Sequence, residues 1–267
     1  MNFQLYELLL LFFIYSFLGW CLEVSYAAIN TGKFVNRGFL YGVICPIYGI
    51  GAVIVIISLT PLINNILILF LGSVFLTSFL EFITGFILEK VFQNKWWDYS
   101  NLPFNIKGYI CLRFSIYWGI GCVFIMKIIQ PFIYTFIKAL PIILGKFIIT
   151  LMILLILIDI IATIITVLNL NKRLKLIDEI SRNIKKLSDE IGQTISDTSL
   201  KVSEKISPIK EDLNNRKLIL DELKVKYKEL FEKNIRSHNR ILKAFPSLRS
   251  KKYNLILEKL KNYHIKK

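Results

Sequence analysis

Residues that bind metals or carry out redox chemistry are scarce in this sequence. Its 267 residues include two histidines and four cysteines. Cys21, Cys45, Cys111 and Cys122 all lie inside apolar runs, and no two of them form a C-x-x-C pair. Free thiols in apolar surroundings pack as small hydrophobic groups. We therefore expect no metal site and no cofactor.

Motifs of nucleotide hydrolysis and hydrolytic catalysis are also absent. The sequence has no G-x-x-x-x-G-K-[ST], no H-E-x-x-H and no G-x-S-x-G. No nucleophile–base pair can be named, so we expect that the chain is not an enzyme. If ATP hydrolysis drives its activity, a separate ATPase subunit must supply it.

Acidic residues are few, and the charges are unevenly distributed. The chain has 34 Lys and Arg against 19 Asp and Glu. Nine of the bases and six of the acids precede residue 171, so the remainder carries 25 − 13 = +12 of the net charge of +15. The first part is strongly apolar, in a chain that is 54% hydrophobic. This division predicts lipid around the first part and water around the second.

Long apolar runs predict an all-α, polytopic membrane protein with about five transmembrane helices in residues 1–170. A helix of about 20 residues crosses the hydrocarbon core, and lipid leaves an open strand's backbone unsatisfied. The spans are expected near 5–29, 39–59, 66–90, 109–131 and 146–168. Residues 132–142 are a short interfacial helix or an extension of the fourth span.

The second span is the least regular. Gly42, Pro46, Gly49 and Gly51 fall close together, and Pro46 removes one backbone donor. An ordinary kinked helix is the simpler interpretation, and a re-entrant or broken helix is the alternative.

The distribution of bases predicts the orientation in the cell membrane. Lys33 and Arg37 lie in the first loop, and Lys95 and Lys107 in the third. Basic loops and the basic tail favour the cytoplasm. With five spans, the N-terminus is then outside and the tail is cytoplasmic. Three lysines of the fourth loop oppose this assignment: Lys127, Lys138 and Lys146.

Residues 171–267 have the pattern of an amphipathic helical tail. Apolar residues recur at three-four spacing from Leu174 to Ile191 and again from Val202 to Leu230. Pro208, preceded by Ser207, is expected to break the tail into two helices. A coiled coil or helical hairpin is one interpretation, and a single solvated helix is the other. Acids alternate with the bases, so nucleic acid is an unlikely partner compared with water or anionic lipid.

Four charged residues of the apolar part are candidates for a substrate or ion path, or for a structural charge cluster: Glu23, Glu81, Glu89 and Arg113. Charges inside a membrane are costly and usually face a partner or a cavity. Residue spacing gives Arg113 a depth similar to that of Glu23, so we expect Arg113 to pair with Glu23 or Glu81. Asp159 has only aliphatic neighbours and is expected to be protonated or paired across a subunit interface.

The loop 91–108 is rich in aromatic residues. Trp96, Trp97 and Tyr99 are typical of a membrane–water interface, where aromatic rings act as anchors. Asp98 is expected to bond to backbone donors or to Lys95. A loop that gates a ligand or docks a partner is the alternative.

Three segments resemble a known bacterial family, the ABC-transporter type IV proteins. They are FIYSFLGWCLEVSYAA at 13–28, GKFVNRGFLYGVICPIYGIGA at 32–52 and LEFITGFILEKVFQNKWWDYSNLPFNIKGYICLRFSIYWG at 80–119. The resemblance covers about residues 5–165. Val43 departs from it, because the family usually has a proline before Ile-Cys-Pro. The resemblance implies a multi-pass, permease-like bacterial membrane protein and assigns no substrate.

The resulting hypothesis is a membrane-embedded transport component, assembled as a homo-oligomer. Glu23, Glu81 and Arg113 would line or brace the path, and Asn36 and Arg37 would guard its cytoplasmic mouth. The alternative is a membrane anchor or scaffold whose tail self-associates or docks a cytoplasmic partner through residues 172–235.

Overall fold

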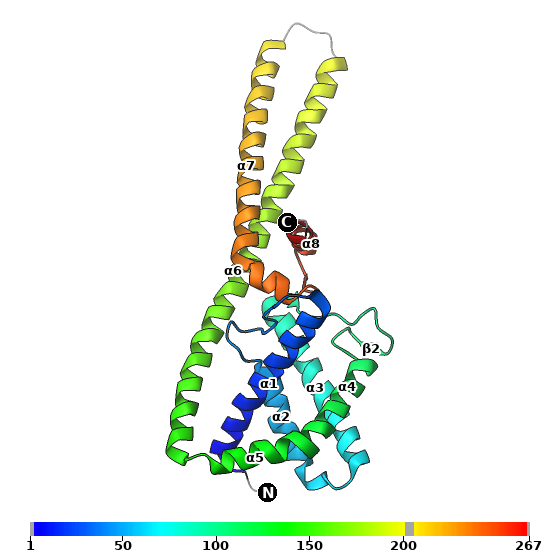
Figure 1. The fold of residues 1–267 in the computed structure, drawn as a ribbon. Helices are drawn as coiled ribbons and strands as arrows, with labels where there is room; N and C mark the ends of the chain where they lie inside the picture. The colour runs from blue at the N-terminus through cyan, green and yellow to red at the C-terminus, as the bar shows by residue number, and fades with distance from the viewer. Residues whose placement is uncertain (1–2, 201–205, 266–267) are drawn as a thin grey trace. The chain divides into compact units, whose positions relative to one another are not determined.

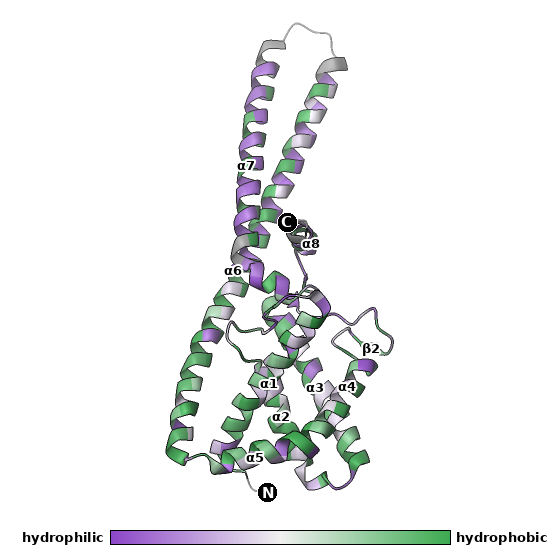
Figure 2. Cartoon of the chain, in the orientation of Figure 1, coloured by the Kyte–Doolittle hydropathy of each residue, from purple (hydrophilic) through white to green (hydrophobic). Residues whose placement is uncertain are grey.

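The computed structural model describes residues 3–200 and 206–265, and most of them are helical (Figure 1). Within these residues, four helical runs are long and apolar enough to cross a membrane: Leu5–Thr31, Ile66–Phe92, Leu112–Ala139 and Ile142–Asp197. Figure 2 shows hydrophobic residues along them. The expected all-α, polytopic membrane fold is therefore confirmed.

Helix α1, Leu5–Thr31, ends at a recognisable sequence signal, and helix α3, Ile66–Phe92, begins at one. Gly32 follows α1 with φ 66°, the left-handed conformation that ends many helices. The side chain of Asn65 caps α3 by accepting hydrogen bonds from the backbone N–H groups of Leu67 and Ile68, both at 3.1 Å. Both helices are therefore defined by local chemistry as well as by hydropathy.

Helix α2 is shorter than the second expected span. It covers Pro46–Leu59 and continues into a single 3₁₀ turn, η1, at Thr60–Leu62. The expected helix over 39–59 therefore begins only at Pro46, and residues 39–45 are not helical. Proline favours the first helical position and pushes the residue before it into extended conformation, as seen at Cys45 with φ −120° and ψ 92°. The broken-helix alternative is closer to this geometry than an ordinary kinked span.

The fourth helical run changes its geometry along its length. Helix α4, Leu112–Phe124, passes into a π-helical turn, η2, at Ile125–Ile129, and then into α5, Gln130–Ala139. Pro131 lies in the first turn of α5, which leaves the direction of α4 (Figure 1). The stretch 132–142 is thus helical as far as Ala139 and continuous with this run, but it takes a different direction from α4.

A hydrophobic core joins these helices. Its fully buried side chains include Leu11 of α1, Ile56 of α2, Leu69 of α3 and Met126 of η2. Ile149 of α6, the helix Ile142–Leu200, packs into the same core. Two short antiparallel pairs complete the fold: β1 (Asn94–Lys95) with β4 (Arg249–Ser250), and β2 (Asn105–Ile106) with β3 (Ile110–Cys111).

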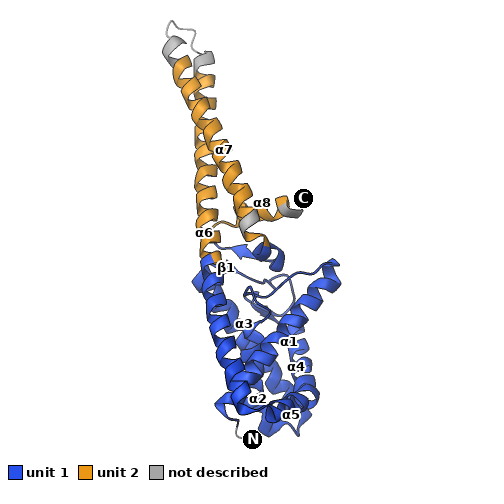
Figure 3. Ribbon diagram, turned by 60° about the vertical axis from the view of Figure 1, so that its left-hand side comes forward, with its two compact units in different colours: residues 1–165, 240–251 blue, residues 166–239, 252–267 orange. Residues whose placement is uncertain are grey.

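The chain divides into two compact units (Figure 3). The first comprises Met1–Ile165 and Arg240–Lys251, and the second comprises Thr166–Asn239 and Lys252–Lys267. The boundary near residue 170 expected from hydropathy falls inside the continuous helix α6. Residues 240–251, assigned to the tail from sequence, pack with the membrane helices instead.

The second unit contains two long helices that run side by side (Figures 1 and 3). They are the later part of α6 and most of α7, the helix Ile206–Ala244, whose last residues from Arg240 onward belong to the first unit. A short helix, α8, covers Asn254–Ile265. Arg216 of α7 pairs with Glu190 of α6 at 3.7 Å. Pro208 lies in the first turn of α7, whereas Val202 of the expected apolar seam is outside the described residues.

Candidate functional site

Glu23 of α1 has two partners in the first unit. The hydroxyl of Tyr48, in the first turn of α2, donates a hydrogen bond of 2.5 Å to its carboxylate. Arg37, in the loop between α1 and α2, pairs with it at 3.4 Å. Both charged side chains are 26% exposed. Glu23 is therefore a paired carboxylate that keeps some access to its surroundings.

Glu81 of α3 is less completely satisfied. The hydroxyl of Tyr99 donates to its Oε1 at 3.2 Å. Its Oε2 is buried and has no hydrogen-bond partner within the described part of the chain. One turn earlier, Ser78 donates to Ser115 of α4 at 2.7 Å. Ser78 of α3 thus faces α4, and one carboxylate oxygen of Glu81 has no hydrogen-bond partner among the described residues.

Tyr99 links the two carboxylates electrostatically. Burial raises the pKa of its hydroxyl most, and the carboxylate of Glu81 raises it further; Cys111 and then Glu23 make smaller contributions in the same direction. The ring of Tyr99 stacks on Phe114 with 4.8 Å between centroids. We call Glu23, Tyr48, Glu81 and Tyr99 the carboxylate–tyrosine cluster.

Arg113 does not belong to this cluster, which corrects the expected ion pair. Its side chain is exposed, and its Nε donates to the hydroxyl of Tyr117 at 3.2 Å. Across the described ranges 3–200 and 206–265, no ion pair joins Arg113 to Glu23 or Glu81. Similar depth does not fix the direction of a side chain around its helix axis, and here Tyr117 lies one turn along the same face.

Glu89 lies near the end of α3 and has two partners. The hydroxyl of Tyr109 donates to it at 2.8 Å, and Lys251 pairs with it at 3.0 Å. Because both partners come from outside α3, Glu89 joins the helix end to the chain segments that cover it. It is not part of the carboxylate–tyrosine cluster.

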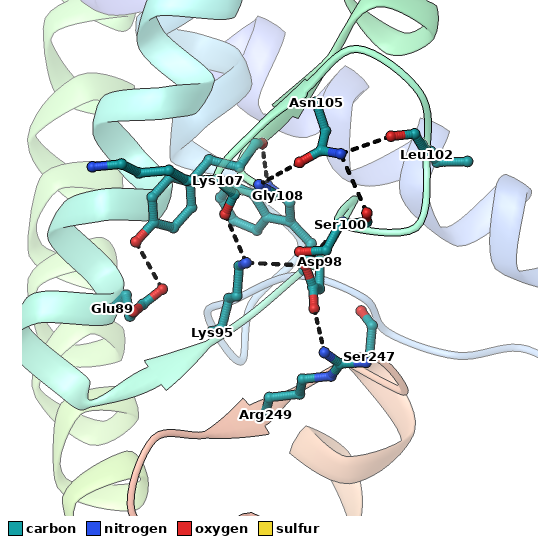
Figure 4. A network of polar contacts seen from close by, with 12 residues as sticks. Glu89, Lys95, Asp98, Ser100, Leu102, Asn105, Lys107, Gly108, Ser247 and Arg249 are labelled. Carbon is teal, nitrogen blue, oxygen red and sulfur yellow. Dashed lines mark hydrogen bonds and ion pairs between the residues drawn. The ribbon is translucent and has the colours of Figure 1, made fainter.

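Asp98 is the centre of a polar network in the loop after α3 (Figure 4). Its side chain is 7% exposed and contacts Lys95 at 2.9 Å and Arg249 at 2.7 Å. The backbone N–H of Ser100 also donates to it, at 3.0 Å. Burial raises the pKa of Asp98, but the hydrogen bonds from Ser100 and Lys95 outweigh burial and lower it overall. The expected bonds to Lys95 and to backbone donors are present, and Arg249 is an additional partner.

Trp96 is not an interfacial anchor, contrary to expectation. It is 3% exposed and packs edge-on against Phe39 at 4.8 Å and against Phe245 at 4.9 Å. Trp97 donates from its indole to the carbonyl of Tyr109 at 2.8 Å. Trp96 lies inward because aromatic partners from distant parts of the chain cover it, which the composition of the loop does not reveal.

Asn36 organises the loop between α1 and α2. Its Oδ1 accepts hydrogen bonds from the indole of Trp20 at 2.9 Å and from the N–H of Gly38 at 3.0 Å. Its Nδ2 donates to the carbonyl of Tyr41 at 2.9 Å. Asn36 is thus a structural centre of the loop, while its neighbour Arg37 contacts the cluster.

Two residues that bind the same loop are not identified as partners by sequence reasoning. Asp159 of α6 accepts hydrogen bonds from the backbone N–H groups of Tyr41 at 2.8 Å and Gly42 at 2.7 Å. Arg240 donates to carbonyls of the same loop. Asp159 therefore has partners within its own chain. The only sequence signal for Arg240 is a base before an apolar stretch, which is too common to be diagnostic.

Fold and site together define a polytopic helical membrane protein with a polar cluster between its helices. The chain belongs to the family described as Putative ABC-transporter type IV, which matches residues 10–164, more than half of its length. No curated protein and no solved structure was found to match the chain. The carboxylate–tyrosine cluster lies within the matched segment, whereas residues 165–267 lie outside it.

Proposed function

We propose that the chain is the membrane-embedded component of a transport system and that the carboxylate–tyrosine cluster lines its polar path. The observation that carries the proposal is Glu81, whose Oε2 is buried without a partner in the described residues. Charged groups between membrane helices are costly and usually serve a pathway or a pair. Glu23 already has Arg37 and Tyr48, so Glu81 is the group with unused binding capacity.

The chemistry of the cluster favours solutes that donate hydrogen bonds or carry positive charge. Two carboxylates contribute acceptor oxygens, and the two tyrosine hydroxyls donate to them. A solute with an ammonium group or a small cation would complete the coordination of Glu81. Arg37 pairs with Glu23, which leaves Glu81 as the acid of the cluster without a charged partner among the described residues.

Energy from ATP would require a separate ATPase subunit, because the sequence has no phosphate-binding loop. The tail's net charge of 25 − 13 = +12 favours placing it in the cytoplasm, where such a subunit would bind. A small number of membrane helices encloses little space, which supports a homo-oligomer around the path.

Flux into proteoliposomes tests the role of Glu81. The purified chain is assayed with rubidium ions and a panel of radiolabelled amines, against liposomes without protein. We expect Glu81→Gln to lower the flux about tenfold or more, equivalent to at least ~1.4 kcal/mol on the barrier. Arg113→Gln is the matched control, because Arg113 lies outside the cluster and its loss should leave flux unchanged. Equal flux through the wild type and Glu81→Gln would contradict the proposed path.

A second candidate function is a scaffold that docks a cytoplasmic partner. Leu218 and Val225 of α7 are 64% and 59% exposed, and they lie beside three acids and one base: Asp221, Glu222, Glu229 and Lys226. An apolar strip whose flanking charges are mostly acidic suits a basic amphipathic helix. Replacing Leu218 and Val225 with serine should abolish co-purification of such a partner and leave flux intact; loss of flux with retained co-purification would exclude this candidate.

A further inference from the structure

Many backbone groups of the loop between α1 and α2 form hydrogen bonds with side chains, some of them from distant parts of the chain. The loop is not helical, yet it belongs to the unit that contains the membrane helices. Backbone groups at membrane depth must be satisfied by protein or by water. Asn36 satisfies the N–H of Gly38 and the carbonyl of Tyr41, and the N–H of Cys45 donates to the carbonyl of Ser16 at 2.9 Å. The other partners come from two distant positions in the chain.

Asp159 supplies the acceptors. Its two carboxylate oxygens each accept one backbone N–H, from Tyr41 and Gly42. The space is closely filled, because a Cβ atom at Gly42 would lie 2.9 Å from Asp159. One carboxylate therefore fixes two successive residues of the loop.

Arg240 supplies the donors. Its guanidinium bonds to three successive carbonyls: Gly38 at 2.9 Å, Phe39 at 3.1 Å and Leu40 at 2.9 Å. It also lies over the ring of Tyr41, 4.1 Å from the centroid. A planar group with five N–H donors can serve several carbonyls at once, which the point charge of a lysine does less well.

The segment that carries Arg240 is firmly attached to the first unit. We call residues 240–251 the strap. Ile241, Ala244 and Leu248 are buried, and Phe245 packs on Trp96. The strap ends in the β1–β4 pair, and its Arg249 binds Asp98 (Figure 4).

The loop in turn carries the partners of Glu23. Arg37 lies within the loop, and Tyr48 follows its end by three residues, at the start of α2. A shift of the loop would therefore move both groups that hold Glu23. Arg240 does not itself touch Glu23, so any effect on Glu23 passes through the backbone of residues 38–41.

We propose that Arg240 is a positioning residue of the carboxylate–tyrosine cluster, and that the strap couples the tail to this cluster by holding the α1–α2 loop. The strap lies outside residues 10–164, the segment matched by the family, and its first residues, 240–244, form the end of α7. Displacement of the strap would release the loop and change the surroundings of Glu23. This regulation presupposes the proposed transport function, whereas the positioning of the loop does not.

Chemical labelling of Cys45 measures the position of the loop without any transport assay. Cys45 is 5% exposed and ends the loop. In the full chain, Cys21, Cys111 and Cys122 are replaced by alanine, and the rate of reaction with N-ethylmaleimide is followed. We expect Arg240→Gln to raise this rate about tenfold through local opening, and Arg240→Lys to raise it less. Lys243→Gln is the control within the strap, because the side chain of Lys243 is exposed, and it should leave the rate unchanged.

A second reporter separates release of the loop from general unfolding. Chains that retain only Cys122, which packs in the hydrophobic core, should react at the same rate with and without Arg240→Gln. An unchanged Cys45 rate in Arg240→Gln, or equal increases at Cys45 and Cys122, would overturn the proposal. If Glu81→Gln fails to alter flux while Cys45 labelling behaves as expected, the positioning role stands and the transport function fails.

Discussion

Gly49 of α2 shows how single residues set the distance between helices. A Cβ atom at this position would clash with the Ser16 hydroxyl and with the Phe12 carbonyl of α1. The carbonyl belongs to the backbone and cannot rotate away. At Gly51 the nearest atom, Leu80 Cδ1, is 3.9 Å away, an ordinary contact. The two glycines therefore differ in function although they lie two residues apart.

Replacing each glycine by alanine tests this difference. Gly49→Ala should destabilise the protein by ~1–3 kcal/mol, because it overpacks the contact between α1 and α2. Gly51→Ala should be neutral or stabilising, since alanine favours the helix by about 1 kcal/mol over glycine. Thermal unfolding in detergent, followed by circular dichroism, measures both. Equal melting temperatures for the two variants would show that α1 and α2 do not approach closely at Gly49.

The sequence indicates how deep a charge lies, but not which way it points. Spacing along the helices placed Arg113 near the level of Glu23, yet its side chain bonds to Tyr117. The tyrosine partners of Glu23 and Glu81 come from α2 and from a loop, so only the packed structure brings them together. Asp159 is satisfied by backbone groups, which sequence patterns do not reveal.

At the scale of helices and loops, local chemistry explains several boundaries. Pro46 determines where α2 begins, and Gly32 and Asn65 mark the end of α1 and the start of α3. Such signals can be read from the sequence. The span expected over 39–59 followed hydropathy instead, and it therefore began before the proline that starts α2. In the second unit, His238 near the end of α7 is buried, so gain of a proton by its ring is expected to affect the stability of that helix.

His238 predicts a pH dependence of the tail helices. Burial lowers its pKa below the usual 6.5, and nearby Arg173 lowers it further. Its ring bonds to the carbonyl of Asn234 at 3.1 Å. The folded state thus binds the proton less readily than the unfolded state, so His238 favours folding above about pH 6.5 and this contribution is lost as the pH falls below it.

Hydrogen exchange of α7 measures this effect. Between about pH 7.5 and 5.5, protection around residues 234–239 should decrease after correction for intrinsic exchange rates. In His238→Gln, which cannot gain the proton, the decrease should be smaller. The same loss of protection in both proteins would show that another group causes it.

At the scale of the whole molecule, the uneven distribution of apolar residues and charges predicts the membrane part well. The resemblance to the ABC-transporter type IV family is confirmed, as is the helical membrane fold. The strap could not be predicted, because Arg240 contacts residues about 200 positions earlier in the chain and no local pattern marks such a pair. Deletion of residues 172–267 would remove the strap together with the tail helices, so point variants separate their roles better.

The central claim is that water reaches a polar cluster between helices whose outer surfaces face lipid. Reaction of engineered cysteines with a membrane-impermeant thiol reagent tests it in sealed vesicles that expose the tail side, in a chain without native cysteines. Ser78→Cys lies one turn before Glu81 on the polar side of α3, whereas Phe75→Cys replaces a side chain that is 69% exposed on the surface of the same helix. We predict reaction at position 78 and none at position 75. No reaction at position 78 from either side, or equal reaction at both positions, would contradict the account.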